Sequence, residues 1–221
     1  MAHPYWPLFD IEVRTPRVML RAVTDDVAVG LAGLGARGVH DPDFAPFLTP
    51  WTDLPAGELE RGVLQFHWRS RAELTPASWR VAFGVFVDDT LVGSTDLFAN
   101  DFAVLRQFET GSWLGREFQG RGLGRELRVA ALSFGFVALG AEWATTGAWH
   151  DNEPSLGVTR SLGYAPDGTR RAVRRGTADT LMEFRMSRAH FIDQVQRDDI
   201  EIACPDAALD LLGVGGGARN A

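Results

Sequence analysis

Glycines and arginines alternate in one short stretch of this 221-residue chain, in a way that suits phosphate binding. Gly120, Gly122 and Gly124 are every second residue, and Arg121 and Arg125 lie among them. The residues before this stretch predict a strand, and those after it predict an amphipathic helix. Free backbone N–H groups and the positive end of a helix dipole would then meet at one point. The stretch therefore predicts a site for a phosphate or pyrophosphate.

Two common phosphate motifs do not fit this stretch. A Rossmann turn needs a glycine where the chain has Arg125, and no acidic residue follows at the distance expected for ribose binding. A P-loop needs a Gly-Lys-Ser/Thr run, and the chain contains no lysine. The run from Gln119 to Gly124 instead resembles the Q/R-x-x-G-x-G/A motif with which GNAT N-acyltransferases hold the pyrophosphate of coenzyme A.

A second motif follows further along the chain. Asn152 is a favourable helix N-cap and Gly163 a favourable C-cap, so a short helix is predicted between them. Taken alone, this segment is equally consistent with a well-capped surface helix. However, its N-x-x-S…L-G-Y arrangement resembles the second GNAT motif, and the two motifs occur in the order typical of that family. Over about residues 8–190 the chain resembles the RimJ/RimL-type branch of the GNAT family.

The resemblance carries expectations about fold and function. Residues 38–52 and 111–123 are most similar to a mycobacterial GNAT protein described as a succinyltransferase. The implied fold is α/β (α+β), with a mixed, mostly antiparallel central sheet, flanking helices and splayed strands around the acyl-CoA site. The implied reaction moves an acetyl or succinyl group from coenzyme A to a primary amine by direct attack in a ternary complex. A non-catalytic module that binds or senses acyl-CoA is the alternative.

The coenzyme site is assigned by this resemblance. In GNAT enzymes the strand before the glycine-rich turn binds the thioester and pantetheine, and the turn binds the phosphates. The residues so assigned are Ser112, Trp113, Leu114, Arg116, Gln119, Gly120, Arg121, Gly122, Leu123, Gly124, Arg125, Asn152 and Ser155. Cations at a helix N-terminus oppose the helix dipole, so the crowded arginines favour an anionic ligand over a solvated helix start. Gly111 and Gly115 flank the binding strand, where we expect a ligand to approach the backbone closely.

Two residues are candidates for proton transfer. Glu109 precedes the turn, near where many GNAT enzymes place a general base, although an outward polar residue on a strand is equally consistent. Its carboxylate could take the ammonium proton if burial raises its pKa, and Asp96 is a weaker rival. Ser155 is a candidate donor of a proton to the departing thiolate, because N-x-x-S places a hydroxyl there in RimL-like enzymes. Many GNAT enzymes carry a tyrosine where this chain has Thr159, whose hydroxyl is a poor acid.

An aromatic-rich region and a basic run are candidates for substrate binding. His40, Phe47, Trp51 and His67 are predicted to line the acyl or acceptor pocket, with core packing as the alternative. Arg174 belongs to the run R-R-A-V-R-R, which would favour succinyl or an acidic acceptor if it faces the site and is otherwise a solvated hairpin.

Composition excludes several other classes. A net charge of −7 disfavours general nucleic-acid binding, and no stretch is long and apolar enough for a membrane span. The five histidines and single cysteine lack metal-ligand spacing, so no metal site is predicted. We expect a cytoplasmic enzyme, because the chain begins without a signal-peptide pattern and its one cysteine cannot form an internal disulfide. Family analogy favours a homodimer or larger homo-oligomer.

The expected elements form a mixed α/β order around these motifs. Residues 1–200 are predicted to form a single GNAT acyltransferase domain, and residues 201–221 a C-terminal extension with a mobile glycine-rich end. Strands are expected at residues 18–23, 79–87, 91–98, 106–114, 143–148, 164–174 and 178–186. Helices are expected at residues 27–37, 56–74 and 121–139, and from residue 152.

Overall fold

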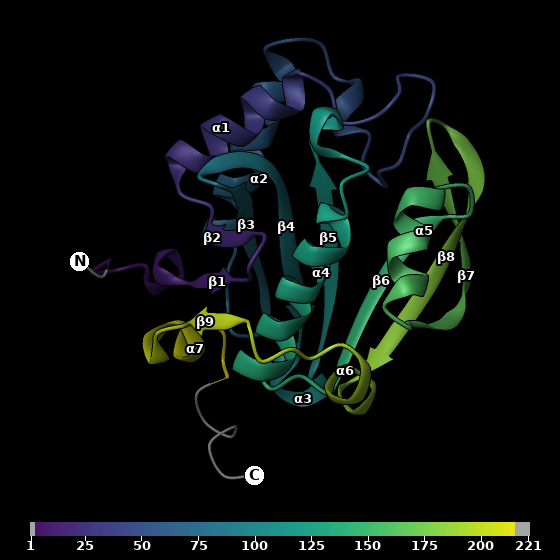
Figure 1. The fold of residues 1–221 in the computed structure, drawn as a ribbon. Coiled ribbons are helices and arrows are strands. Elements are labelled where there is room, and N and C mark those ends of the chain that lie inside the picture. The colour runs from purple at the N-terminus through teal and green to yellow at the C-terminus, as the bar shows by residue number, and fades with distance from the viewer. Residues whose placement is uncertain (1–2, 215–221) are drawn as a thin grey trace.

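A single large sheet forms the centre of the protein. The computed structural model describes residues 3–214, and within them nine strands pair in the order β7-β8-β6-β5-β4-β3-β2-β1-β9 (Figure 1). Only the β5–β6 pair is parallel, and every other neighbouring pair is antiparallel. The predicted fold, a mostly antiparallel mixed sheet flanked by helices, is confirmed.

The predicted elements appear in the expected order with small shifts at their ends, and α3, α6, β9 and α7 are additional to them. The strands are β1 Glu12–Arg14, β2 Met19–Ala22, β3 Ser78–Val87, β4 Thr90–Asn100, β5 Gln107–Leu114, β6 Trp143–Trp149, β7 Ala165–Arg174, β8 Thr177–Ser187 and β9 Glu201–Ala203. The α-helices are α1 Asp25–Ala36, α2 Glu58–Ala72, α3 Phe102–Leu105, α4 Leu123–Ser133, α5 Glu153–Ser161, α6 Arg188–Gln194 and α7 Asp206–Leu211. Short 3₁₀ turns are η1 Pro7–Asp10, η2 Trp51–Asp53 and η3 Arg116–Phe118, and η4 Phe134–Ala138 is a π-helix.

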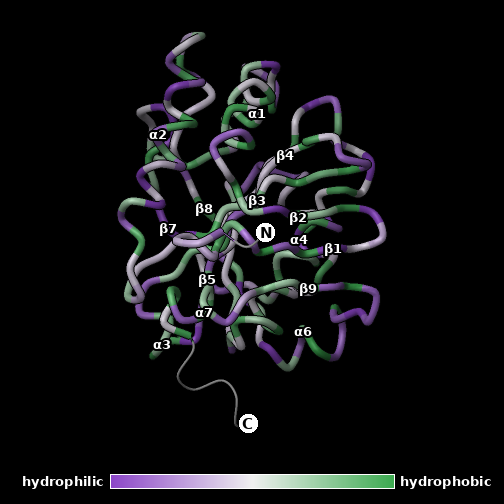
Figure 2. Tube along the Cα trace, turned by 90° about the vertical axis from the view of Figure 1, so that its left-hand side faces the viewer, coloured by the Kyte–Doolittle hydropathy of each residue, from purple (hydrophilic) through white to green (hydrophobic). Residues whose placement is uncertain are grey.

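Alternation along the strands separates two layers of helices. On β3, Phe83 packs against Phe134 at the end of α4, whereas Gly84 lies against Val27 of α1 on the opposite face. The larger core fills the α4 side of the sheet, and a smaller cluster fills the α1–α2 side. In Figure 2, hydrophobic positions follow the central strands and hydrophilic ones colour much of the outer loops.

Strands β5 and β6 separate soon after they meet. Their parallel pairing covers only Gln107–Glu109 against Trp143–Thr145, although both strands continue beyond it. Figure 1 shows the two strands diverging with α4 in front of them. An opening between the strands therefore lies next to the glycine-rich turn that follows β5.

The long helix expected over residues 121–139 differs at both ends. Gly122 is left-handed, with a φ of 76°, so α4 begins at Leu123. After Ser133 the helix widens into η4, where Gly135 lies against the ring of Phe108 and has no room for a Cβ atom.

The segment beyond residue 200 joins the sheet. Strand β9 pairs with β1, and Leu212 and Val214 are buried in the main core. Most of the glycine-rich end expected to be mobile lies outside the described residues.

Candidate active site

The turn between β5 and α4 is tied to neighbouring segments by one of its own side chains. Gly120 and Gly122 both adopt left-handed φ angles, 73° and 76°. The amide of Gln119 donates to the carbonyl oxygens of Val39 at 2.6 Å and Leu114 at 2.9 Å. The side chain of Gln119 therefore fixes the turn, and its role is structural in addition to any contact with a ligand.

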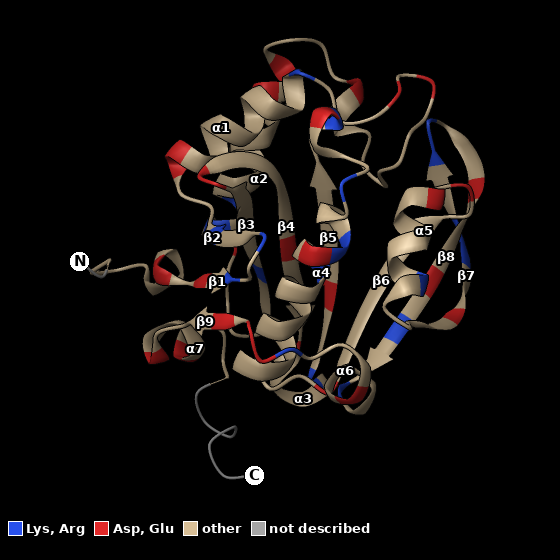
Figure 3. Cartoon of the chain, in the orientation of Figure 1, with Lys and Arg blue, Asp and Glu red and all other residues tan. Residues whose placement is uncertain are grey.

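The start of α4 has the properties of an anion site. Its N-cap is Gly122, which supplies no side-chain acceptor to the first N–H groups of the helix. Arg17 donates to the carbonyl oxygen of Arg121 at 2.7 Å, and Arg125 is exposed with no side-chain partner among the described residues. Figure 3 shows blue residues at this end of α4. Free N–H groups and nearby guanidinium groups fit the phosphates of coenzyme A.

Arg17 was missed by sequence reasoning. It lies far from the turn in the sequence and reaches it only because β1 and β2 lie beside α4 in the fold. By contrast, the predicted Arg116 points toward Asp41, with 3.6 Å between their charged atoms.

The two glycines that flank the binding strand lie against side chains of the protein. A Cβ atom on Gly111 would lie 2.5 Å from Oδ1 of Asp96, and one on Gly115 would lie 2.6 Å from Cδ1 of Leu34. Both glycines make room for side chains of the protein, and the close approach of a ligand to their backbone stays a prediction.

Glu109 lies on the face of the sheet that α1 and α2 cover. It is half-buried, and burial raises its pKa, with Arg170 and Arg80 opposing that shift and Asp96 and Glu183 adding to it. Each of the other two acids has an arginine partner: Asp96 pairs with Arg80, and Glu183 pairs with Arg170 at 2.6 Å. Among the described residues Glu109 makes no side-chain hydrogen bond or ion pair. It is therefore a carboxylate available to a ligand.

An aromatic cluster joins the loop after α1 to β5. Ring centroids are 5.8 Å apart for His40 and Phe47, 5.3 Å for Phe47 and Trp51, and 5.4 Å for Trp51 and Trp113. The imidazole of His40 is held by the hydroxyl of Thr52 at 2.7 Å. The structure thus brings three of the predicted pocket residues together with Trp113, which belongs to the strand assigned to coenzyme binding.

Arg174 is committed to partners within the protein. Its guanidinium lies 2.8 Å from Asp151 and 3.0 Å from Asp179, and it also donates to the carbonyl oxygen of Ala45 at 2.8 Å. The side chain is only 12% exposed. The positive charge of Arg174 is therefore already balanced. Its hydrogen bond to Ala45 ties the β7–β8 hairpin to the loop before α2.

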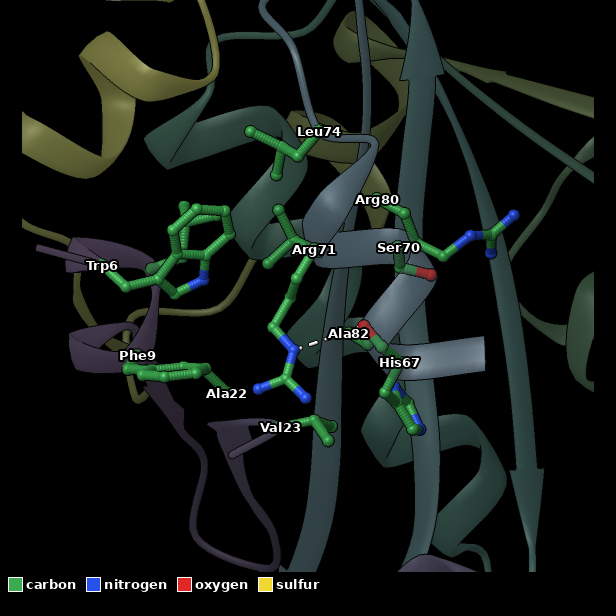
Figure 4. A pocket seen from close by; sticks show the side chains of 12 residues that line it. Trp6, Phe9, Ala22, Val23, His67, Ser70, Arg71, Leu74, Arg80 and Ala82 are labelled. Carbon is green, nitrogen blue, oxygen red and sulfur yellow. Dashed lines mark hydrogen bonds between the residues drawn. The ribbon is translucent and has the colours of Figure 1, made fainter. Parts of the chain in front are cut away.

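His67 lies apart from the aromatic cluster. Figure 4 shows it on α2 beside Arg71, facing Ala82 of β3, in a small pocket of about 30 Å³. Burial lowers its pKa to about 4, with Arg71 and Arg80 adding to the effect. The structure therefore does not group His67 with the other predicted pocket residues, and its position is that of a neutral core histidine.

The neutral state of His67 predicts a stability change with pH. Its folded pKa of about 4 lies below the ordinary value of 6.5, so between these pH values the unfolded chain binds more protons. We expect acidification through this window to lower the free energy of unfolding by about 2 to 3 kcal/mol more in the native chain than in His67→Gln. Urea unfolding at several pH values measures this, with replacement of the exposed His3 by glutamine as the control. Equal slopes in the native chain and His67→Gln would contradict the assignment.

The second motif forms the start of α5. Oδ1 of Asn152 accepts the N–H of Ser155 at 3.3 Å, which is the predicted N-cap. Ser155 is half-buried, and its hydroxyl has no partner among the described residues. Thr159, at the place of the usual tyrosine, is 1% exposed.

Polar side chains meet in the opening between β5 and β6, and two of them, Arg128 and Thr146, were not among the predicted site residues. Arg128 of α4 is buried and donates to the hydroxyl oxygens of Thr146 and Ser112, each at 3.1 Å. The hydroxyl of Thr146 in turn donates to the carbonyl oxygen of Thr110 at 3.3 Å. A signal was present in the sequence, since an arginine within the apolar run of a helix is unusual.

Comparison with known families decides the assignment. Residues 17–165 match the family described as "Acetyltransferase (GNAT) domain", and this match includes β5, the glycine-rich turn, α4 and α5. The chain belongs to the GNAT acetyltransferase family. As a GNAT N-acyltransferase it is an enzyme that uses acyl-CoA as its donor. The glycine-rich turn and the start of α4 fit the phosphates of that donor.

Solved GNAT structures share this fold. RimL, a ribosomal L7/L12 α-N-protein acetyltransferase in complex with coenzyme A, is 14% identical over 78% of this chain and 95% of its own, with a TM-score of 0.63. Mutant forms of the spermidine/spermine N-acetyltransferase SpeG from Vibrio cholerae are 14% identical over 81% and 99%, with a TM-score of 0.61. A GNAT-family acetyltransferase from Bacillus anthracis is 14% identical over 80% and 99%, with a TM-score of 0.64. At these identities the likeness shows the fold alone.

A curated relative matches a shorter part of this GNAT enzyme. An N-acetyltransferase 9-like protein from Nematostella vectensis is 34% identical over 77 residues, which are 34% of this chain and 39% of that protein. Within residues 3–214 no group of three His, Cys, Asp or Glu side chains is placed to hold a metal ion. No helix in that part of the chain has the length and apolar character to cross a membrane.

Proposed function

We propose that this GNAT enzyme transfers an acetyl group from acetyl-CoA to a primary amine, with Glu109 as the general base. The observation that carries the proposal is the unpaired, half-buried carboxylate of Glu109 on the strand that leads to the glycine-rich turn. Burial raises the pKa of Glu109, which moves a carboxylate toward the range useful for taking a proton from an ammonium group.

We assign roles to the other residues from their places in the two motifs and in the fold. The thioester of acetyl-CoA supplies an activated acyl carbon. The N–H groups at the start of α4 and the side chains of Arg17 and Arg125 hold phosphates, and Ser112 to Leu114 with Asn152 bind the pantetheine end. The aromatic cluster excludes water and orients the amine beside the thioester. Ser155, with its free hydroxyl, donates a hydrogen bond toward the departing sulfur.

The ion pairs of the basic hairpin favour acetyl over succinyl as the acyl group. For the hairpin to select succinyl, Arg174 or Arg175 would have to offer the succinyl carboxylate an uncompensated guanidinium group. Arg174 is paired with two aspartates, and Arg175 is paired with Asp53 at 2.7 Å. Binding of a second carboxylate by either guanidinium would break an existing pair, which costs free energy.

The proposal also covers the acceptor, the branch of the GNAT family and the assembly of the enzyme. The structural neighbours include an α-N-protein acetyltransferase and a spermidine/spermine N-acetyltransferase, so a protein N-terminus and a small polyamine are the acceptor classes to test. We propose membership of the RimJ/RimL-type branch, a cytoplasmic location, a homo-oligomeric assembly and a single acyltransferase domain over residues 1–200, to whose sheet the C-terminal extension adds β9.

Thiol release by the full-length chain tests the proposal directly. Acetyl-CoA and succinyl-CoA are each offered with spermidine or with a peptide that has a free N-terminus. We expect release with acetyl-CoA and at least one amine, and a kcat/KM at least tenfold lower with succinyl-CoA. Tight acetyl-CoA binding without release with any amine supports a binding module instead. A preference for succinyl-CoA contradicts the choice of acyl group.

A further inference from the structure

Arg128 is a buried cation without an anionic partner. Its side chain belongs to a residue only 4% exposed, and its hydrogen bonds go to the neutral hydroxyl groups of Ser112 and Thr146. No carboxylate of residues 3–214 forms an ion pair with it, and Glu126, two residues earlier on α4, is paired with Arg197. A buried charge without a counter-charge is costly to the fold. A function that needs a cation at this place would explain why the fold keeps a buried guanidinium despite its destabilising effect.

The guanidinium spans the opening between β5 and β6. Backbone pairing of the two strands ends at Glu109 and Thr145, one residue before Thr110 and Thr146. From that point the strands are joined through side chains: Arg128 contacts Ser112 of β5 and Thr146 of β6. The cation therefore lies on the α4 side of the sheet, next to the strand assigned to the thioester.

Three buried polar atoms without partners mark the same place. They are Nε of Arg128, Oγ1 of Thr110 and the hydroxyl of Tyr164. Tyr164 follows α5 in the sequence, and burial raises its pKa, with Arg128 and Thr110 as its polar neighbours. Buried polar groups in folded proteins are almost always hydrogen-bonded. Nε of Arg128 and the two hydroxyl groups are thus polar neighbours of one another, and in the described part of the chain no carboxylate lies among them to balance the guanidinium charge.

We propose that Arg128 stabilises the negative charge on the sulfur of coenzyme A as the thiolate leaves. This inference rests on the acyl transfer proposed above. The nitrogen lone pair of the amine forms the new bond to the acyl carbon, the carbon–sulfur bond breaks, and its electron pair stays on sulfur. Glu109 takes the first proton of the ammonium group, which frees the lone pair, and the second proton leaves nitrogen for solvent water as the amide forms. Arg128 keeps its protons throughout, since a guanidinium is not deprotonated in proteins.

A thiolate stabilised in this way can depart without a strong acid. The chain has Thr159 where many GNAT enzymes carry a tyrosine acid, and Thr159 is buried with its carbonyl oxygen accepting the N–H of Tyr164. The cation of Arg128 therefore compensates for the missing acid. The competing explanation is that Arg128 serves only to tie β5 to β6.

The test compares coenzyme A with desulfo-coenzyme A, which lacks the thiol, by calorimetric titration of the full-length chain from pH 6.5 to 9. An ordinary thiol has a pKa of about 8.5. If the site lowers that value for the bound thiol, coenzyme A binds more tightly as pH rises through the window between the bound and free values. We expect about a tenfold gain in affinity for coenzyme A relative to desulfo-coenzyme A.

Titration of other charged groups does not change the difference in affinity between the two ligands. Facing or flanking Arg128 are Arg125 and Glu126 on α4 and Tyr164 after α5, whereas Trp143–Trp149 contributes no ionisable side chain and Glu109 lies on the opposite face of β5. Any titration of these groups affects both ligands, and the difference between the ligands reports the thiol.

Two variants separate charge from structure. Arg128→Met should abolish the pH-dependent gain and lower kcat about 100-fold, whereas Arg128→Lys should keep most of the gain. Equal pH dependence of the two ligands in the native chain would overturn the inference, whether or not the variants fold. A native chain that binds neither ligand at any pH would contradict the proposed function instead.

Discussion

Replacement of Glu109 by glutamine should lower kcat by about 10²- to 10⁴-fold while acetyl-CoA still binds. Glutamine keeps the size of the side chain and cannot accept a proton from the ammonium group. In the native enzyme kcat/KM should fall as pH falls through the raised pKa of Glu109, because the protonated carboxyl is inactive as a base. Steady-state kinetics from pH 5 to 9 measure both effects, and Glu109→Gln should lose the acidic limb of the profile.

The same variant should gain stability at neutral pH. The folded pKa of Glu109 is raised by burial, so its ionised form costs the folded state free energy above that pKa, and the cost disappears as pH falls. Removal of the charge should leave the free energy of unfolding at pH 7 unchanged or higher. Lower activity together with equal or greater stability would distinguish a base from a structural side chain.

Asp96→Asn is the matched comparison. Asp96 shares this face of the sheet but is paired with Arg80. We expect Asp96→Asn to lower stability through loss of this ion pair and to keep the acidic limb of the pH profile. If the limb instead disappears in Asp96→Asn and persists in Glu109→Gln, the base has been assigned to the wrong residue.

Replacement of Gly122 by tryptophan should weaken acyl-CoA binding at least 100-fold. Gly122 has a φ of 76°, and left-handed backbone costs other residues roughly 1–2 kcal/mol. A side chain there would also lie 3.2 Å from Nη1 of Arg17, over the N–H groups at the start of α4. Calorimetric titration with acetyl-CoA measures the loss, and urea unfolding measures the separate cost to stability.

Gly33→Ala provides the control for glycine replacement. Gly33 is exposed on α1, and a Cβ atom there would contact nothing within 4 Å. Its replacement should leave the affinity for acetyl-CoA unchanged and slightly stabilise the helix. Undiminished affinity in folded Gly122→Trp would move the phosphate site away from this turn.

The sequence alone determined the features that depend on local conformation. Between the strands expected at residues 79–87 and 91–98, Asp88 and Asp89 form a turn with φ angles of 46° and 59°, as a tight hairpin requires. The glycine-rich turn, the helix after it and the cap at Asn152 also form where they were predicted. Backbone angles, capping and strand alternation are set by residues close in sequence, so they can be read without knowledge of the fold.

The tertiary structure alone decided which charges are free to act. The charge of Arg174 is balanced by Asp151 and Asp179. Its guanidinium also donates to the carbonyl oxygen of Ala45, 129 residues away in the sequence. Arg128 is left without an anion, and Glu109 without a direct ion-pair partner, by the same packing. Burial and pairing arise from contacts between segments distant along the chain, and these contacts set the electrostatic free energy of each group. Residue type and spacing therefore predict where a charge lies along a strand or helix, whereas only the packed fold determines whether it is available for chemistry.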